Sequence, residues 1–212
     1  MKLILARHGQ TYWNSQRRLQ GRLDSKLTAI GRSQATLLAK MVGRESVDAI
    51  VSSDLNRAVA TASKAAGRLG LKVIRRKELR EIGYGKLEGM DEADLERAFP
   101  GLWAKRQKDR IHYRVPGGEN YLDVARRLKP FIRWLLKKFG DQTVLVVGHG
   151  NLNRVLMGLL LKYAHRKWLG IHQPNYVVYF MDVRRGKAGN LRHLTLGHYR
   201  KHPGLFKVQW WQ

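Results

Sequence analysis

Length and composition indicate one globular domain. The chain has 212 residues, 43% of them hydrophobic, and no Pro- or Gly-rich linker, which predicts a single domain over residues 1–212. It has no cysteine, which excludes disulfides and thiolate zinc sites, and no apolar run near the roughly 20 residues of a membrane span, so we expect a cytoplasmic protein with no membrane association. The 41 Lys and Arg against 16 Asp and Glu give a net charge of +25, and such a field attracts anions from small phosphorylated metabolites to nucleic acids.

Strands and helices alternate along the first part of the chain. The expected elements are a strand at 3–6, a polar loop at 10–26 and a helix that Thr28 caps and that runs to about residue 41. A strand at 48–51, a helix that Asp54 caps and that ends at Gly67 or Gly70, and a strand at 72–74 follow. Alternation of this kind is typical of an α/β fold.

The second part continues the pattern. It predicts a Gly-rich loop at 83–89, a helix from Asp91 to Phe99, a helix at 119–139 that Gly140 closes, a strand at 143–147, a helix at 151–162, and two closing edge strands at 176–181 and 191–196. The apolar runs at 3–6 and 144–147 are typical of strands buried on both faces. We therefore expect a three-layer sandwich, a mostly parallel central sheet with helices on both faces.

Two of these strands end in a histidine flanked by glycine. Arg7-His8-Gly9 follows the first strand, and Gly148-His149-Gly150 follows the strand at 143–147. Ligands of open α/β sheets bind beyond the carboxyl ends of the strands, so we expect one shared site there.

The residues around these histidines suit an oxyanion. Arg7, and Arg57 on the first turn of the helix after the strand at 48–51, supply guanidinium groups that match phosphate oxygens. Gly9 and Gly150 allow close approach of a ligand, and we expect the helix that starts near Asn151 to point its N–H groups at the anion.

The ordered motifs resemble the histidine phosphatase superfamily, in its phosphoglycerate-mutase-like branch, from residue 3 to about residue 182. The matching blocks are Leu5–Thr11 with Asn14 and Gln20-Gly21, Leu27–Gly31 with Gln34-Ala35, Ser52–Leu55 with Arg57-Ala58 and Thr61-Ala62, Leu79–Ile82 with Gly85, Glu88 and Gly89, Gly117–Glu119, and Gly148–Gly150 with Asn153-Arg154.

The resemblance implies phosphoryl transfer through a phosphohistidine, with no cofactor and no metal. His8 is then the nucleophile, and Glu81 is the acid and base, a role that partial burial favours. The resemblance also implies the groups that hold the phosphate and the substrate, which are Arg7, Arg57, His149, Asn14, Gln20, Gly21, Gly150 and Asn151. The remaining histidines lack the spacing of a metal site.

The resemblance further implies that an insertion around 90–118 covers the pocket. Its basic stretch provides Arg110, His112 and Arg114 as candidate substrate contacts, although a solvated helix face fits the same stretch. A basic extension follows around 185–212, and its Trp210-Trp211 pair packs on the body of the protein or on another subunit, which leaves a homodimer open.

Around Glu81 the sequence favours a phosphatase. The block Leu79–Gly85 is similar to the phosphatase version, whereas mutases usually carry an Asn-Glu-Arg-His-Tyr-Gly type of block. Gly83 and Asn151 depart from the usual phosphatase residues, so the resemblance does not identify the substrate. We expect hydrolysis of a small sugar phosphate or phosphorylated acid.

Two other functions remain as alternatives. One is a phosphoglycerate mutase. The other is a catalytically weak protein that binds polyanions or nucleic acid nonspecifically through its charge. The charge is diffuse, since Asp182 is the only carboxylate from Gln142 onward, whereas a nucleic-acid arm is more often a clustered tail.

Overall fold

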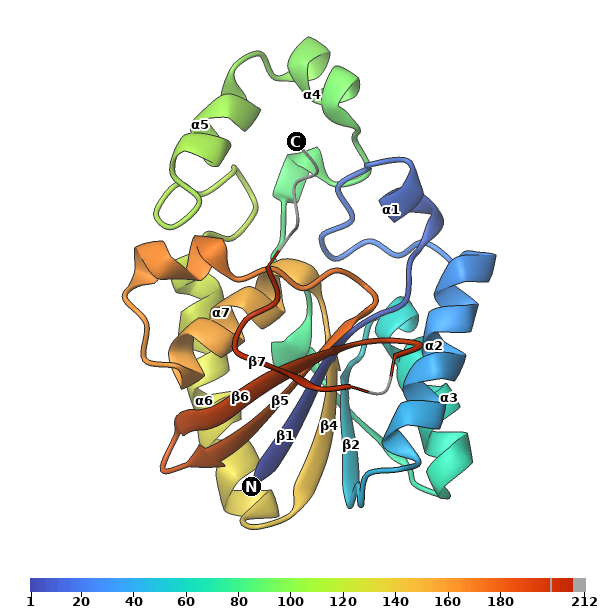
Figure 1. Cartoon of the computed structure of the whole chain (residues 1–212). Helices are drawn as coiled ribbons and strands as arrows, with labels where there is room; N and C mark the ends of the chain where they lie inside the picture. Colours follow the sequence, from blue (N-terminus) through green and yellow to red (C-terminus); the bar gives the residue numbers. More distant parts are fainter. Residues whose placement is uncertain (199, 208–212) are drawn as a thin grey trace.

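A central twisted sheet organises the molecule (Figure 1). The computed structural model describes residues 1–198 and 200–207, and within them the sheet has the strand order β3-β2-β4-β1-β5-β6-β7. The strands are β1 (Lys2–Arg7), β2 (Ala49–Ser53), β3 (Val73–Arg76), β4 (Thr143–Gly148), β5 (Val177–Arg184), β6 (Lys187–Thr195) and β7 (His202–Pro203). β3, β2, β4 and β1 run parallel, and β5, β6 and β7 add antiparallel pairs.

Helices cover both faces of this sheet. α2 (Ala29–Val42) and α3 (Asn56–Leu69) lie on one side in Figure 1, and α6 (Tyr121–Phe139) and α7 (Gly150–Leu160) lie on the other. Successive residues of β1 alternate between the two apolar cores, because Leu3 and Leu5 join the α6–α7 side while Ile4 and Ala6 join the α2–α3 side. The α/β three-layer prediction is confirmed.

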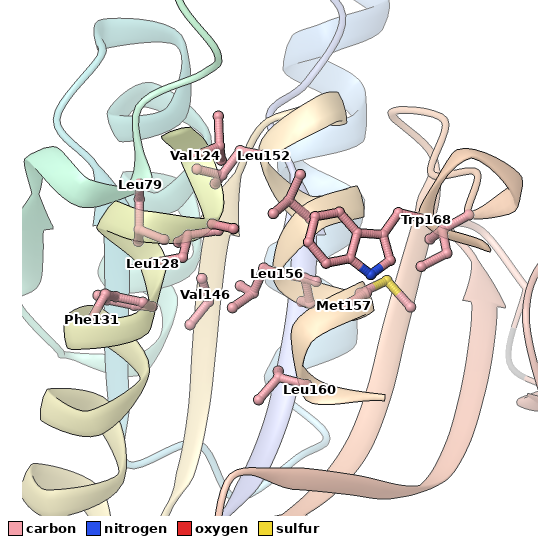
Figure 2. Close-up of a cluster of buried hydrophobic side chains, with 14 of the residues drawn as sticks. Leu79, Val124, Leu128, Phe131, Val146, Leu152, Leu156, Met157, Leu160 and Trp168 are labelled. Atoms are coloured by element: carbon pink, nitrogen blue, oxygen red, sulfur yellow. The ribbon is translucent and has the colours of Figure 1, made fainter. Parts of the chain in front are cut away.

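Tight packing fixes α7 in the larger core (Figure 2). Leu156 and Met157 of α7 are fully buried there, and Trp168 of the 3-10 helix η3 (His165–Gly170) packs beside them. A Cβ atom on Gly158 would lie 2.2 Å from Cδ1 of Trp168, so only glycine lets the indole come this close. These contacts fix the second half of α7, the helix that His149 caps at its start.

The predicted helix starts are correct in two cases and wrong in a third. Thr28 caps α2 and Asp91 caps α4 (Glu92–Ala98) through their side chains. Asp54 does not cap α3, because its carboxylate pairs instead with Arg80 at 2.8 and 2.6 Å, and the N-cap position belongs to Leu55, which has no capping side chain.

Other boundaries shift by a few residues. α6 starts at Tyr121 because Asn120 caps it in a capping box with Asp123, and α7 starts at Gly150, one residue before the predicted position. The loop predicted at 10–26 contains the short α1 (Tyr12–Ser15), which Thr11 caps. The remaining short helices are η1 (Lys77–Leu79), η2 (Gly85–Leu87) and α5 (Leu102–Lys108).

The two closing strands were wrongly predicted as edges. β5 lies between β1 and β6, and β6 lies between β5 and β7. The alternating, partly polar pattern of β6 resembles an edge strand because one face of an antiparallel sheet can meet water. Trp210 and Trp211 lie outside the described residues. No helix in the described part of the chain is long and apolar enough to cross a bilayer.

Candidate active site

The two motif histidines lie side by side at the ends of neighbouring parallel strands. Arg7 at the end of β1 is in register with Gly148 at the end of β4, so the next residues, His8 and His149, are adjacent. Their ring centroids are 5.1 Å apart, and their exposed fractions are 2% and 0%. The structure thus brings together the histidines that the sequence placed at one site.

The ring of His8 is held in one orientation. Its Nδ1 is 2.8 Å from the carbonyl oxygen of Gly9, so Nδ1–H donates to that oxygen and the lone pair lies on Nε2. Asn175 donates to the carbonyl oxygen of His8 at 2.7 Å, and the amide of Gly9 donates to Thr61. Burial, reinforced by the positive charges of Arg57 and Arg7, holds the pKa of His8 well below its usual value. His8 is therefore a neutral, fixed imidazole with an available Nε2.

Two guanidinium groups flank the histidines: Arg57 is buried, and Arg7 is partly exposed with its Nε buried. Arg57 is 1% exposed and donates to Asp24 and to the carbonyl oxygens of Leu23 and Gly21, while Arg7 donates to the carbonyl oxygen of Gln173. Burial lowers the pKa of both guanidinium groups, and the charges of Asp24 on Arg57 and of Glu81 on Arg7 oppose that shift.

Several buried nitrogens of this cluster have no hydrogen-bond partner among the described residues. They are Nε of Arg7, Nε of Arg57 and both ring nitrogens of His149. Burial lowers the pKa of His149 well below its usual value, with Arg57 as the next cause. Buried polar groups in proteins are nearly always hydrogen-bonded, and a tetrahedral oxyanion offers acceptors for such a set.

Glu81 lies against the start of α7. Its carboxylate accepts three backbone N–H bonds, from Ile82 at 2.9 Å, Asn151 at 3.1 Å and Leu152 at 2.9 Å, and the residue is 8% exposed. The N–H groups of Asn151 and Leu152 therefore bind Glu81, and the prediction that they face the substrate anion is wrong. The same bonds place the carboxylate close to His149, which is the N-cap of α7.

Asn151 and Gly150 have positioning contacts. The side chain of Asn151 donates to the hydroxyl of Tyr84 at 2.8 Å and accepts from the hydroxyl of Tyr121 at 2.7 Å. A Cβ atom on Gly150 would lie 3.3 Å from Cζ of Arg7, so glycine leaves room for that guanidinium. The side chain of Asn151 is thus already bound by protein groups.

The long loop after β1 contributes Asn14, Gln20 and Gly21. Oδ1 of Asn14 accepts from the backbone and hydroxyl of Thr11, and no hydrogen bond uses its Nδ2 within the described structure. Gln20 is buried, and its Oε1 has no partner among the described residues. The carbonyl oxygen of Gly21 accepts from Nη2 of Arg57 at 2.7 Å, so this loop is attached to the arginine.

The three predicted substrate contacts of the insertion differ in their exposure. Arg114 pairs with Asp123 at 2.6 Å and His112 with Asp109 at 3.1 Å, and both side chains are more than half exposed. Both side chains are therefore engaged in ion pairs at the protein surface. Arg110 is partly buried, and its charge acts on the buried Tyr84 and on His172.

Sequence reasoning missed Arg106 in the same insertion. It is 2% exposed, its guanidinium lies 5.3 Å from the ring centroid of Tyr121, and its Nε has no partner among the described residues. Arg106 lies four residues after Leu102 and so shares a face of α5 with it, a spacing that could have indicated its burial. The basic residues around it obscured that pattern. Asp24 was also missed, and Thr61, although part of a matching motif block, was given no role. Within residues 1–198 and 200–207, no group of three or more His, Cys, Asp or Glu side chains is arranged to hold a metal ion.

Comparison with known proteins decides the family. The model of the histidine phosphatase superfamily, branch 1, matches residues 3–195. The chain belongs to this superfamily. A glucosyl-3-phosphoglycerate phosphatase of Mycobacterium tuberculosis is 37% identical over 175 residues, which cover 79% of this chain and 78% of the relative. The expectation of an enzyme of a phosphatase family is confirmed.

Other relatives carry names that indicate different activities. A phosphoserine phosphatase 1 of Hydrogenobacter thermophilus is 34% identical and covers 87% of this chain and 89% of the relative. A probable phosphoglycerate mutase of Yersinia enterocolitica is 35% identical, with 76% and 75% covered. A solved structure of a mycobacterial glucosyl-3-phosphoglycerate phosphatase complexed with VO3 has a TM-score of 0.80 and 33% identity, and covers 92% of this chain and 97% of that one.

Proposed function

We propose that this protein is a metal-independent phosphomonoester hydrolase that forms a phosphohistidine at His8. One observation carries the proposal: Nδ1–H of His8 is bound to the Gly9 carbonyl, so Nε2 has its lone pair available next to the unpartnered donors of Arg7, Arg57 and His149. A nucleophile beside positioned cationic donors is the arrangement that phosphoryl transfer requires.

The first half-reaction transfers the phosphoryl group to His8. Nε2 attacks phosphorus, a P–N bond forms, and the ester P–O bond breaks. Arg7, Arg57 and His149 stabilise the charge on the phosphoryl oxygens. Protonated Glu81 gives its proton to the leaving alkoxide. From the part of the chain that the structure describes, Oε1 of Glu81 accepts two backbone N–H bonds and Oε2 accepts one, so Oε2 has a lone pair for that proton.

The second half-reaction reverses these roles. The Glu81 carboxylate takes a proton from water, the water oxygen attacks phosphorus, and the P–N bond to His8 breaks to release inorganic phosphate. The lowered pKa of His8 makes the imidazole neutral at both the start and the end of the cycle. Atoms and protons balance without any further reactant.

The substrate class is a small phosphorylated metabolite, either a sugar phosphate or a phosphorylated acid. The names of the two phosphatase relatives contain phosphoglycerate and phosphoserine, both of which carry an acid group besides the phosphate. Arg106 and Arg110 add positive charge near Tyr84. Compounds with more than one anionic group should therefore be hydrolysed best.

Hydrolysis of p-nitrophenyl phosphate in excess EDTA tests the proposal. Wild-type enzyme should retain turnover in EDTA, His8→Ala should lose at least about a thousandfold in kcat, and the exposed His198→Ala variant should match wild type. Wild-type enzyme quenched in alkali should carry a base-stable, acid-labile phosphate that His8→Ala lacks.

Other results would favour the alternative functions. Turnover that EDTA abolishes, or that survives in His8→Ala, contradicts the mechanism. Phosphoryl transfer from phosphoglycerate to a second hydroxyl without release of phosphate would indicate a mutase. Wild-type enzyme that is inert but binds heparin with a steep salt dependence would indicate a polyanion-binding protein.

A further inference from the structure

Asp24, which no motif singled out, connects the loop after β1 to the first turn of α3. Oδ2 of Asp24 accepts the amide N–H of Asn56 at 2.8 Å, and Oδ1 accepts the amide of Arg57 at 3.4 Å and its Nη1 at 2.8 Å. We infer that Asp24 is a positioning residue that orients the guanidinium of Arg57 for phosphoryl binding. This inference rests on the proposed function of the site.

The carboxylate of Asp24 replaces a missing helix cap. α3 begins after Leu55, whose side chain cannot accept a hydrogen bond, so the first N–H groups of the helix need another acceptor. Asp24 supplies it from a loop more than thirty residues earlier in the chain. Because Arg57 is the second residue of α3, one carboxylate fixes both the backbone and the guanidinium of the same residue.

An inventory of the N–H groups of Arg57 shows what these contacts leave for a ligand. A guanidinium group has five N–H bonds. Nη1 uses two of them, on Asp24 and on the Leu23 carbonyl, and Nη2 uses one on the Gly21 carbonyl. Counting partners among residues 1–198 and 200–207, Nε–H and one N–H of Nη2 remain for an oxyanion. Asp24 thus holds the end of the guanidinium group that the ligand does not use.

Charge supports the same role. Burial is the main influence on the pKa of Arg57, which it lowers, and Asp24 is the largest opposing charge. Asp24 therefore acts as the counter-ion of a guanidinium group that is only 1% exposed. Without the Asp24 carboxylate, one N–H of Nη1 would lose its charged acceptor inside the protein while the other keeps the Leu23 carbonyl, so the guanidinium group would be held less firmly in its single orientation.

The direction in which kcat/KM changes when the charge of Asp24 is removed distinguishes a positioning role from simple repulsion of the substrate. A carboxylate near a phosphate site repels the dianionic substrate, so if this were its only effect, neutralising it would raise kcat/KM. If Asp24 positions Arg57, neutralising it lowers kcat/KM, because the transition state loses an oriented donor. A purely structural role lowers the melting temperature and leaves kcat/KM of the folded enzyme unchanged.

Asp24 also borders a cavity of about 410 Å³, which provides a second readout. The cavity is lined by Asp24 and Arg57 together with Lys26, Arg32 and Lys64. In Asp24→Ala, a formate ion can enter from this basic cavity and occupy the position of the missing carboxylate. In Asp24→Asn, the amide side chain still occupies that position.

The experiment compares Asp24→Ala and Asp24→Asn with Asp54→Ala as the matched control. Asp54 also pairs with an arginine just before α3, namely Arg80, whose side chain is 35% exposed against 1% for Arg57, and Glu81 is held separately by backbone N–H groups. All variants are assayed with p-nitrophenyl phosphate at a temperature where circular dichroism shows them folded. We expect kcat/KM of both Asp24 variants to fall about ten- to a hundredfold, Asp54→Ala to stay within about twofold of wild type, and formate to restore Asp24→Ala several-fold without affecting Asp24→Asn.

Three outcomes would overturn the inference. They are Asp24 variants with unchanged or raised kcat/KM, Asp54→Ala with an equal loss, and Asp24→Ala that does not respond to formate. Wild-type enzyme without activity would instead overturn the proposed function, so the two failures are distinguishable.

Discussion

His8 and His149 are buried as neutral imidazoles, and this makes stability depend on pH. Burial, followed by the positive charge of Arg57, lowers the pKa of both below 6.5 in the folded protein, whereas the unfolded chain titrates near 6.5. Below about pH 6.5 the unfolded state binds more protons than the folded state. The free energy of unfolding is therefore highest above that pH and decreases as the pH falls toward the folded pKa values.

Urea unfolding at pH 7.5 and 5.5 measures this effect. Wild type should lose on the order of 1 kcal/mol for each buried histidine between the two pH values. His149→Gln should lose less than wild type, because one titrating group is gone, and the exposed His198→Ala should lose as much as wild type. Equal losses in wild type and His149→Gln would show that His149 is not held neutral.

At the same scale, sequence could predict some site residues and not others. His8 and His149 follow apolar strands, so their meeting at one sheet edge follows from topology. Asp24 lies in an irregular loop, and nothing local shows that its carboxylate reaches α3. Arg106 was given no role because its neighbours are charged and fit a solvated helix face as well as a pocket-covering segment, whereas the structure buries it.

Among the elements, helices α3 and α7 each contain an interior glycine, and their surroundings predict opposite effects of alanine. A Cβ atom on Gly67 would have no neighbour within 4 Å, whereas one on Gly158 would lie 2.2 Å from Trp168. Gly67→Ala should stabilise the protein by about 0.5–1 kcal/mol through helix propensity. Gly158→Ala should destabilise it by about 2 kcal/mol or more, because the indole must leave its packed position.

Thermal or urea unfolding of the two variants gives the comparison. Gly67→Ala should keep the kinetics of wild type. Gly158→Ala should also weaken catalysis, since α7 carries His149 at its start. A Gly158→Ala variant as stable as wild type would show that Trp168 can move without cost.

Element boundaries followed from sequence where the cap is local. Thr28 and Asp91 cap the helices that directly follow them, and their spacing revealed this. Asp54 failed as a cap because Arg80, distant in sequence, competes for its carboxylate. The order of β5 and β6 also depended on partners that lie far along the chain. Local chemistry predicts elements, and long-range pairing decides their neighbours and exact starts.

For the whole molecule, the net charge of +25 should act mainly through long-range attraction of anions. Such attraction scales with the charge of the substrate and is screened within about 8 Å at physiological ionic strength. The buried donors at His8 act at contact distance and are screened much less. Added salt should therefore weaken the long-range attraction of the substrate by the surface charge and leave the chemical step at His8 largely unchanged.

The comparison uses two substrates at two salt concentrations. From about 50 to 500 mM NaCl, kcat/KM for a bisphosphorylated glycerate or sugar should fall about tenfold or more, while that for p-nitrophenyl phosphate should fall much less. The fall should appear in KM rather than kcat, because screening weakens the encounter and leaves Arg7 and Arg57 in place. Parallel falls for both substrates, or a fall in kcat, would mean that salt acts on the site itself. In that case the surface charge would not serve to attract the substrate. Inhibition by heparin at low salt would then indicate that it binds a polyanion.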